Sequence, residues 1–108
     1  MIIDIHSEED LKREILEKQG FVFLQMGASW CRPCQVMKPA FEAVEERFEG
    51  KVRLCRLDVD EQGEMASRFE LAGTPTFLFF KDGKEVGRII GYRQKNKFFE
   101  DIEKFMNQ

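Results

Sequence analysis

The chain has 108 residues, of which 43% are hydrophobic and 11 are phenylalanine, which is enough apolar material for one core and predicts a single domain over residues 1–108. Its net charge is −3, with 17 basic and 20 acidic residues interspersed, which argues against a nucleic-acid-binding protein. No apolar stretch reaches the length of a membrane span, so no membrane partner is expected.

The first predicted elements are a strand over residues 2–6, which are rich in β-branched side chains, and a helix that ends at Gly20. Ser7 followed by Asp10 resembles a capping box, and one side of the helix is apolar at Leu11, Ile15 and Leu16. The N-terminus has neither the basic region nor the long apolar region of a secretion signal, so a cytoplasmic protein is expected. The alternative is an exported protein whose signal is missing from this sequence.

Residues 21–26 are almost continuously apolar, as is typical of a central strand covered on both faces, and Gln25 is the one polar exception. After the motif at residues 28–35, apolar residues recur at helical spacing, at Met37, Phe41, Val44 and Phe48. A second strand is predicted over residues 52–59. This order indicates a right-handed βαβ unit with parallel strands.

The motif at residues 28–35, ASWCRPCQ, places Cys31 and Cys34 in the first turn of the predicted helix. Side chains three residues apart in a helix lie about 5 to 6 Å from each other, within the separation that a disulfide tolerates. A loop this short loses little chain entropy when it is bridged, so the bond is expected to stabilise the fold weakly and to exchange easily. The spacing therefore predicts a redox-active disulfide.

Position within the turn distinguishes the two thiols. Cys31 falls at the helix start, where free N–H groups and the helix dipole favour a thiolate, so it is the expected exposed nucleophile. Cys34 is the expected resolving thiol, and Pro33 suits the first turn because it has no N–H to lose. The alternatives are an incidental cysteine pair or half of a zinc site, for which only Cys55 and His6 remain as further ligands.

The rest of the chain predicts a short helix, two strands joined by a turn, and a C-terminal helix. Cys55 is expected to be buried in the strand at 52–59, and a short helix is expected over residues 61–70. A buried strand at 77–80 and a strand at 84–90 flank Asp82-Gly83, which is a hairpin signal. A C-terminal helix carries apolar residues at Phe98, Ile102 and Phe105.

Over nearly its full length, the chain resembles the thioredoxin family. The resemblance rests on features in matching order and spacing: Trp30-Cys31-x-Pro33-Cys34, Pro39, Thr74-Pro75-Thr76, Lys81-Asp82-Gly83 and Gly91. It implies the thioredoxin fold of the α/β class, a three-layer α/β/α sandwich with a central mixed sheet of about five strands and four helices.

The resemblance also implies roles for individual residues. Cys31 is the nucleophile, Cys34 is the resolving thiol, and Pro75 is a cis-proline that faces the sulfurs. Substrate is expected to dock on a surface formed by Trp30, Thr74, Pro75 and Gly91. The implied activity is protein-disulfide reduction by a monomer that receives electrons from a thioredoxin-reductase-like donor and needs no cofactor beyond its own disulfide.

Three positions depart from the usual family pattern. Gln25 stands where a buried aspartate normally serves the resolving thiol, and Arg56, the neighbour of that acid, is expected to face an uncharged partner. Arg32 replaces a glycine and Thr74 an apolar residue. A nearby cation and a missing anion both favour the Cys31 thiolate, which makes the disulfide more oxidising. An oxidase or isomerase is therefore one alternative to a reductase, and a non-catalytic binding module that uses the surface around Trp30 is another.

Overall fold

The computed structural model describes residues 1–108, and at its centre is a mixed five-stranded sheet in the order β1-β3-β2-β4-β5. The middle strands β2 and β3 are parallel, β1 is parallel to β3, and β4 is antiparallel to both β2 and β5. The strand bounds are β1 (Ile2–Asp4), β2 (Phe21–Gly27), β3 (Val52–Asp58), β4 (Thr76–Lys81) and β5 (Lys84–Ile90).

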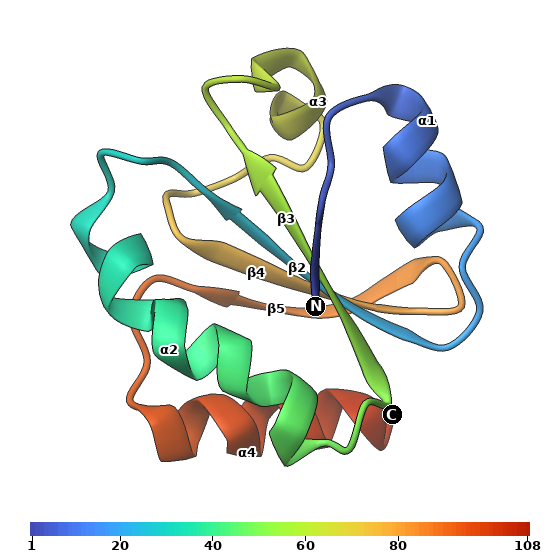
Figure 1. Cartoon of the computed structure of the whole chain (residues 1–108), viewed down its shortest axis with the longest axis vertical. Coiled ribbons are helices and arrows are strands. Elements are labelled where there is room, and N and C mark those ends of the chain that lie inside the picture. Colours follow the sequence, from blue (N-terminus) through green and yellow to red (C-terminus); the bar gives the residue numbers. More distant parts are fainter.

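Helices cover both faces of this sheet. Two of them, α2 (Arg32–Arg47) and α4 (Lys95–Met106), lie on one side, and α1 (Glu8–Leu11) and α3 (Gly63–Ser67) lie on the other (Figure 1). A π-helical segment, η1 (Lys12–Leu16), continues α1. The expected three-layer α/β/α sandwich with five strands and four helices is confirmed.

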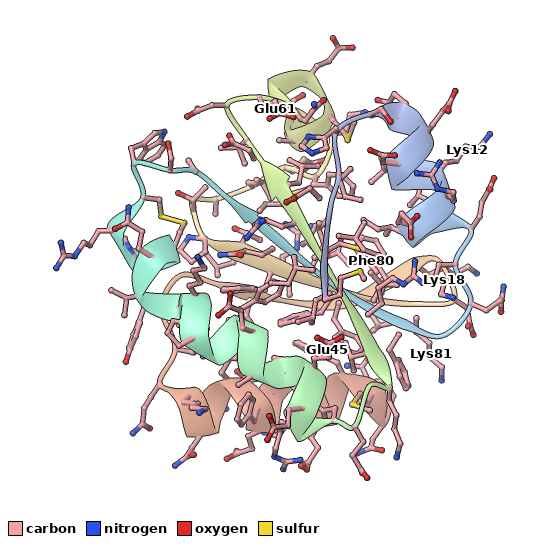
Figure 2. All side chains as sticks on the ribbon, in the orientation of Figure 1. Lys12, Lys18, Glu45, Glu61, Phe80 and Lys81 are labelled. Atoms are coloured by element: carbon pink, nitrogen blue, oxygen red, sulfur yellow. A yellow bond between two sulfur atoms is a disulfide. The ribbon has the colours of Figure 1, made fainter.

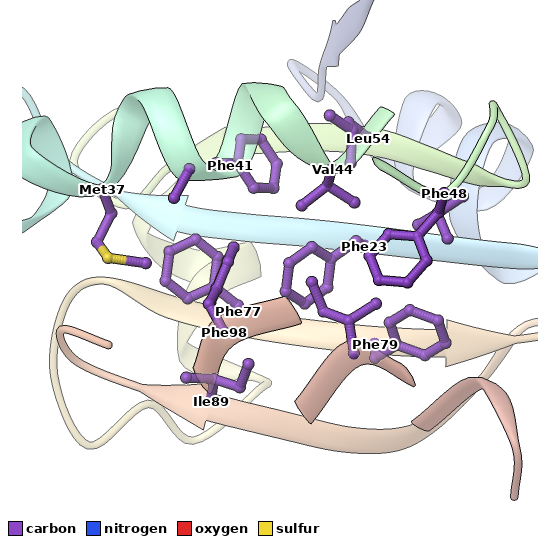
Figure 3. Packing of buried hydrophobic residues seen from close by; sticks show 13 residues of the cluster. Phe23, Met37, Phe41, Val44, Phe48, Leu54, Phe77, Phe79, Ile89 and Phe98 are labelled. Atoms are coloured by element: carbon purple, nitrogen blue, oxygen red, sulfur yellow. The ribbon is translucent and has the colours of Figure 1, made fainter. Parts of the chain in front are cut away.

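Phenylalanine rings dominate the core between the sheet and the pair α2 and α4 (Figure 3). The rings of Phe23 on β2 and Phe77 on β4 stack with centroids 5.5 Å apart, and Phe41 from α2 and Phe98 from α4 pack onto them. Burial of each such side chain contributes about 1.5 to 3 kcal/mol. The start of α2, where the cysteines lie, is therefore anchored by the well-packed remainder of the helix.

The N-terminal elements are shorter than the sequence predicts. The first strand ends at Asp4 instead of residue 6, and the helix ends at Leu16 instead of Gly20. The Glu17 N–H donates to the carbonyl of Lys12, which closes the helix with a wide turn. Gly20 belongs to the next connection, where its N–H donates to Oδ1 of Asp82 at 2.7 Å.

The predicted hairpin between β4 and β5 is confirmed. Asp82 and Gly83 have φ values of 51° and 84°, the left-handed conformation that a two-residue turn requires at both central positions. The antiparallel return of β5 brings Ile90 beside Thr76. The segments before β4 and after β5 consequently lie at the same end of the sheet as the cysteines, because Thr76 also pairs with Met26 on β2.

Candidate active site

Cys31 and Cys34 form a disulfide at the start of α2, with their Cα atoms 5.3 Å apart (Figure 2). Cys31 is the N-cap residue of the helix, and its Sγ accepts a hydrogen bond from the N–H of Cys34 at 3.2 Å. Pro33 lies in the first turn, where it removes no helical hydrogen bond. The structure thus brings together the two thiols that the spacing assigns to one helical turn.

The expectation that Cys31 is exposed is wrong for the disulfide form, whereas Cys34 is shielded as expected. The exposed fractions are only 3% for Cys31 and 7% for Cys34. The bond holds Sγ of Cys31 back over the helix, where the disulfide packs against Ala28 and Val59. Arg32 and Pro33 are exposed beside it.

Trp30 is the most exposed aromatic residue next to the disulfide, with 67% of its surface accessible. Its indole is nevertheless held in place, because Nε1 donates to Oδ2 of Asp60 at 2.6 Å. Asp60 lies two residues beyond the end of β3, and no local pattern in the sequence links it to Trp30.

The remaining residues of the expected docking surface lie at the same end of the sheet. The Thr74-Pro75 peptide bond is cis, and the carbonyl of Pro75 accepts from the N–H of Gly91 at 2.8 Å. Tyr92, which follows Gly91, is 56% exposed and was not anticipated from the sequence. Together with Trp30, it adds exposed aromatic surface at this end of the sheet.

Beneath the cysteines, the side of the sheet that faces α2 changes from apolar to polar. Along β2 this face carries Phe23, then Gln25 and then Gly27, because alternate residues of a strand share a face. Gln25 is buried, and its Nε2 lies 3.7 Å from the position that a Cβ on Gly27 would take. The same position is 3.0 Å from Sγ of Cys34. Gln25 and Cys34 therefore converge where Gly27 lacks a side chain.

The expectation that Arg56 faces an uncharged partner is wrong. Arg56 pairs in register with Gln25 on one side and with Asp4 on the other, and its Nε donates to Oδ1 of Asp4 at 2.9 Å. The carboxylate that partners Arg56 therefore comes from β1, two strands away from β2. This pairing depends on the order of the strands and has no signal in the local sequence.

A cavity of about 470 Å³ extends over this polar region to Cys34. Its charged walls come from several elements and include Asp4, His6, Lys38, Arg56, Asp58 and Glu61. A cavity of this size with polar walls holds water. Cys34 is therefore buried in the protein and yet in contact with a polar, hydrated space.

Cys55 takes no part in this site. It is fully buried in the core on the opposite face of the sheet, as the sequence predicts, and burial raises the pKa of its thiol to about 12. No cluster of three or more histidine, cysteine or acidic side chains is arranged to hold a metal ion. None of the helices has the length and hydrophobicity of a membrane-spanning helix.

Comparison of the sequence with known proteins gives a consistent result. The family model described as "Thioredoxin" matches residues 2–104. The thioredoxin of Staphylococcus saprophyticus is 35% identical over 89 residues, which cover 82% of this chain and 86% of that protein. The thioredoxin of Staphylococcus aureus is 33% identical over a segment of the same length and coverage.

Solved structures agree with the sequence comparison. The thioredoxin of Malassezia sympodialis has a TM-score of 0.86 and 28% identity, with 98% of this chain and 91% of that chain covered. Thioredoxin NaTrxh from Nicotiana alata has a TM-score of 0.83 and 30% identity, with 96% and 91% covered. The likeness to both structures covers nearly the whole of this chain.

Proposed function

This chain belongs to the thioredoxin family, and we propose that its Cys31–Cys34 pair reduces disulfides in protein substrates. Family membership makes it a protein-disulfide oxidoreductase. The observation that supports this assignment to the cysteine pair is the disulfide at the N-terminus of α2. An N-capping sulfur is the position in a helix that most favours a thiolate.

In the proposed reaction, the Cys31 thiolate attacks a substrate disulfide and forms a mixed disulfide. Cys34 then attacks Cys31, the Cys31–Cys34 bond forms, and the substrate leaves as a dithiol. The N–H of Cys34 already donates to Sγ of Cys31, and the helix dipole adds about 0.3 to 1 kcal/mol in favour of a negative charge there. Cys31 is therefore assigned as the nucleophile and Cys34 as the resolving thiol.

The proposed substrate-docking surface consists of Trp30, Thr74, Pro75 and Gly91. The Pro75–Gly91 hydrogen bond and the exposure of Trp30 support this assignment. An extended substrate segment would lie between the indole and the backbone of Thr74, so that recognition depends on main-chain hydrogen bonds and local shape. Such a surface accepts many protein disulfides without a defined sequence.

The remaining features of the proposal concern partners and setting. The chain acts as a single-domain monomer over residues 1–108, in the cytoplasm, where structural disulfides are rare and a dithiol is kept reduced. It transfers electrons from a thioredoxin-reductase-like donor to protein disulfides. Its redox group is the Cys31–Cys34 pair, with no added cofactor.

Reduction of insulin by dithiothreitol tests this function. The wild-type protein should accelerate precipitation of the insulin B chain, and Cys31→Ser should abolish the acceleration while the fold is retained by circular dichroism. A Cys55→Ser variant serves as the control and should keep the activity, because Cys55 lies on the opposite face of the sheet. A wild-type protein no more active than Cys31→Ser would instead indicate a binding module.

A more oxidising enzyme, an oxidase or isomerase, is the second candidate, and the neutral buried Gln25 favours it. Without a carboxylate at that position, less negative charge opposes the Cys31 thiolate, and the exposed Arg32 adds a cation nearby. Pro33 and Arg56 are the other residues proposed to tune the potential. The equilibrium of the Cys31–Cys34 pair with a glutathione buffer separates the two candidates, since a more oxidising pair is reduced at a lower ratio of thiol to disulfide.

A further inference from the structure

The resolving thiol needs a proton acceptor that the neutral Gln25 cannot supply. This requirement rests on the proposed function, in which Cys34 attacks the mixed disulfide as a thiolate. Cys34 is 7% exposed, and burial disfavours the charged form of a thiol. The amide of Gln25 can orient a water molecule but cannot take up a proton as a carboxylate does.

Asp58 is the carboxylate that the strand pairing places nearest to Gly27 and Cys34. It pairs in register with Gly27, and neighbouring strands are about 4.8 Å apart. Paired residues present their side chains on the same face, so Asp58 points to the side of the sheet on which Cys34 lies. A Cβ on Gly27 would be 3.0 Å from Sγ of Cys34, and because Gly27 has none, the cavity reaches both Asp58 and Cys34.

One oxygen of Asp58 is free of protein partners. Oδ1 accepts from the backbone N–H groups of Asp60 at 2.8 Å and Glu61 at 3.2 Å, which fixes the orientation of the carboxylate. No protein group donates to Oδ2, and the residue is half-buried. The carboxylate is thus held rigidly, with one oxygen available to water in the cavity.

We propose that Asp58 accepts the proton of Cys34 through water in this cavity and that Gln25 positions that water. The thiol proton passes through the water to Oδ2 of Asp58. Sγ of Cys34 then attacks Sγ of Cys31, the Cys31–Cys34 bond forms, and the bond between Cys31 and the substrate sulfur breaks. The electron pair leaves with the substrate sulfur, and the proton on Asp58 is returned to solvent through the open cavity.

The other charged groups around the cavity are less suited to this task. Asp4 of β1 is paired with Arg56 of β3, and His6, two residues beyond the end of β1, is paired with Glu61 at 2.7 Å. Because β3 lies between β1 and β2, Asp4 is one strand farther from Gly27 than Asp58 is. Lys38 of α2 is a basic side chain and offers no carboxylate oxygen as a proton acceptor.

The test follows the reaction of the fully reduced protein with 5,5′-dithiobis(2-nitrobenzoate). Attack by Cys31 releases one chromophoric thiolate in a bimolecular phase, and resolution by Cys34 releases a second in a unimolecular phase. Asp58→Asn keeps an oxygen that can accept from Asp60 and Glu61, so the loop should be retained. We expect this variant to slow the second phase by at least about tenfold near neutral pH and to leave the first phase unchanged. The deficit should shrink as pH rises and hydroxide removes the thiol proton.

Glu61→Gln is the matched control, because it removes a carboxylate from the same cavity wall. It should resolve the mixed disulfide at the wild-type rate. Equal second phases in Asp58→Asn and wild type across the pH range would overturn the proposal, as would a larger effect of Glu61→Gln. Absence of the first phase in the wild type would contradict the proposed function itself, so the two failures are distinguishable.

Discussion

Gly27 packs closely against Cys34: a Cβ on Gly27 would lie 3.0 Å from Sγ of Cys34. Gly27 does not have a positive φ, so the backbone does not require glycine there. The requirement comes from the close approach of the disulfide to the end of β2. The same lack of a side chain leaves room for the cavity between Cys34 and Asp58.

Gly27→Ala is therefore expected to destabilise the oxidised protein. The added methyl group overpacks against the disulfide, which typically costs about 1 to 3 kcal/mol in the free energy of unfolding. Urea unfolding of the oxidised protein measures this loss. Gly63→Ala is the control, because no atom lies within 4 Å of a Cβ at that position. If both variants unfold at the same urea concentration as the wild type, the contact at Gly27 does not constrain the site.

Cys31 should be the first cysteine to be alkylated in the reduced protein near neutral pH. Reduction breaks the bond that ties Sγ of Cys31 to Cys34, while the N-cap position of Cys31 keeps its thiolate favoured by the N–H of Cys34 and the helix start. Cys55 is 0% exposed, and the burial that raises its pKa to about 12 leaves almost no thiolate. Limited iodoacetamide treatment followed by peptide mass spectrometry identifies the labelled residue, and predominant labelling of Cys55 would contradict the assignment.

Gln25→Asp is expected to speed resolution of the mixed disulfide and to lower stability. The new carboxylate can accept the Cys34 proton, whereas Gln25→Asn has the same size without that ability. Relative to Gln25→Asn, we expect the resolution step in Gln25→Asp to be a few times faster. We also expect its free energy of unfolding to be about 1 to 3 kcal/mol lower, because the carboxylate is charged at a buried position where the amide of Asn is neutral. Burial disfavours the charged form, so this loss should grow as pH rises through the carboxyl pKa.

The same variant should shift the redox equilibrium. An anion near the disulfide disfavours the Cys31 thiolate and thereby makes the pair less oxidising. Rapid mixing gives the resolution rate, and a glutathione titration gives the equilibrium. Resolution equally fast in Gln25→Asp and Gln25→Asn would mean that residue 25 fills space and does not limit proton transfer.

Loss of the Asp60 carboxylate should loosen Trp30 and weaken substrate docking. The indole Nε1 donates to Asp60 at 2.6 Å while most of the ring is exposed, so this bond is the main restraint on its orientation. A hydrogen bond of this kind contributes about 0.5 to 1.5 kcal/mol, which corresponds to an increase of about two- to tenfold in KM for a protein disulfide in Asp60→Ala. Because Trp30 is the only tryptophan, its fluorescence anisotropy reports the loosening directly. Asp60→Asn keeps an acceptor and should show a smaller effect in both measurements.

The ion pair between His6 and Glu61 should stabilise the protein over a limited pH range. The hydrogen bond to Glu61 raises the pKa of His6 above its ordinary value, and the bond to His6 lowers the pKa of Glu61. The His6 contribution is complete below the ordinary histidine pKa of 6.5 and is lost as pH rises through the raised value. The Glu61 contribution is present above 4.5 and is lost as pH falls through the lowered value.

Stabilisation by the pair should therefore be greatest between about pH 4.5 and 6.5. The measurement is the difference in unfolding free energy between wild type and His6→Asn, taken inside this window and well above it. The difference should be small, because both side chains are exposed, and it should decrease toward high pH. A difference that is the same at every pH would indicate that His6 acts through packing alone.

Local patterns in the sequence were sufficient for the order of the helices and strands and for the disulfide, although not for every element boundary. The central β2-α2-β3 unit, the Asp82-Gly83 hairpin and the Cys31–Cys34 pair each depend on residues close together in the chain. Hydrophobic periodicity and turn-forming residues are patterns of neighbouring residues, so these features can be predicted from the sequence without a structure. The early end of the first helix was missed because its closing turn depends on backbone hydrogen bonding that no residue type signals.

The polar environment of Cys34 was decided by the tertiary structure. Asp4 partners Arg56, and Asp58 faces the space left by Gly27, only because β3 lies between β1 and β2 in one particular register. A shift of one residue would turn Asp4 and Asp58 to the opposite face of the sheet. Strand order and register result from packing the whole core between two layers of helices, so no local stretch of sequence contains them. The sequence alone thus predicted the cysteine pair that forms the disulfide, and the packed sheet determined which groups surround it.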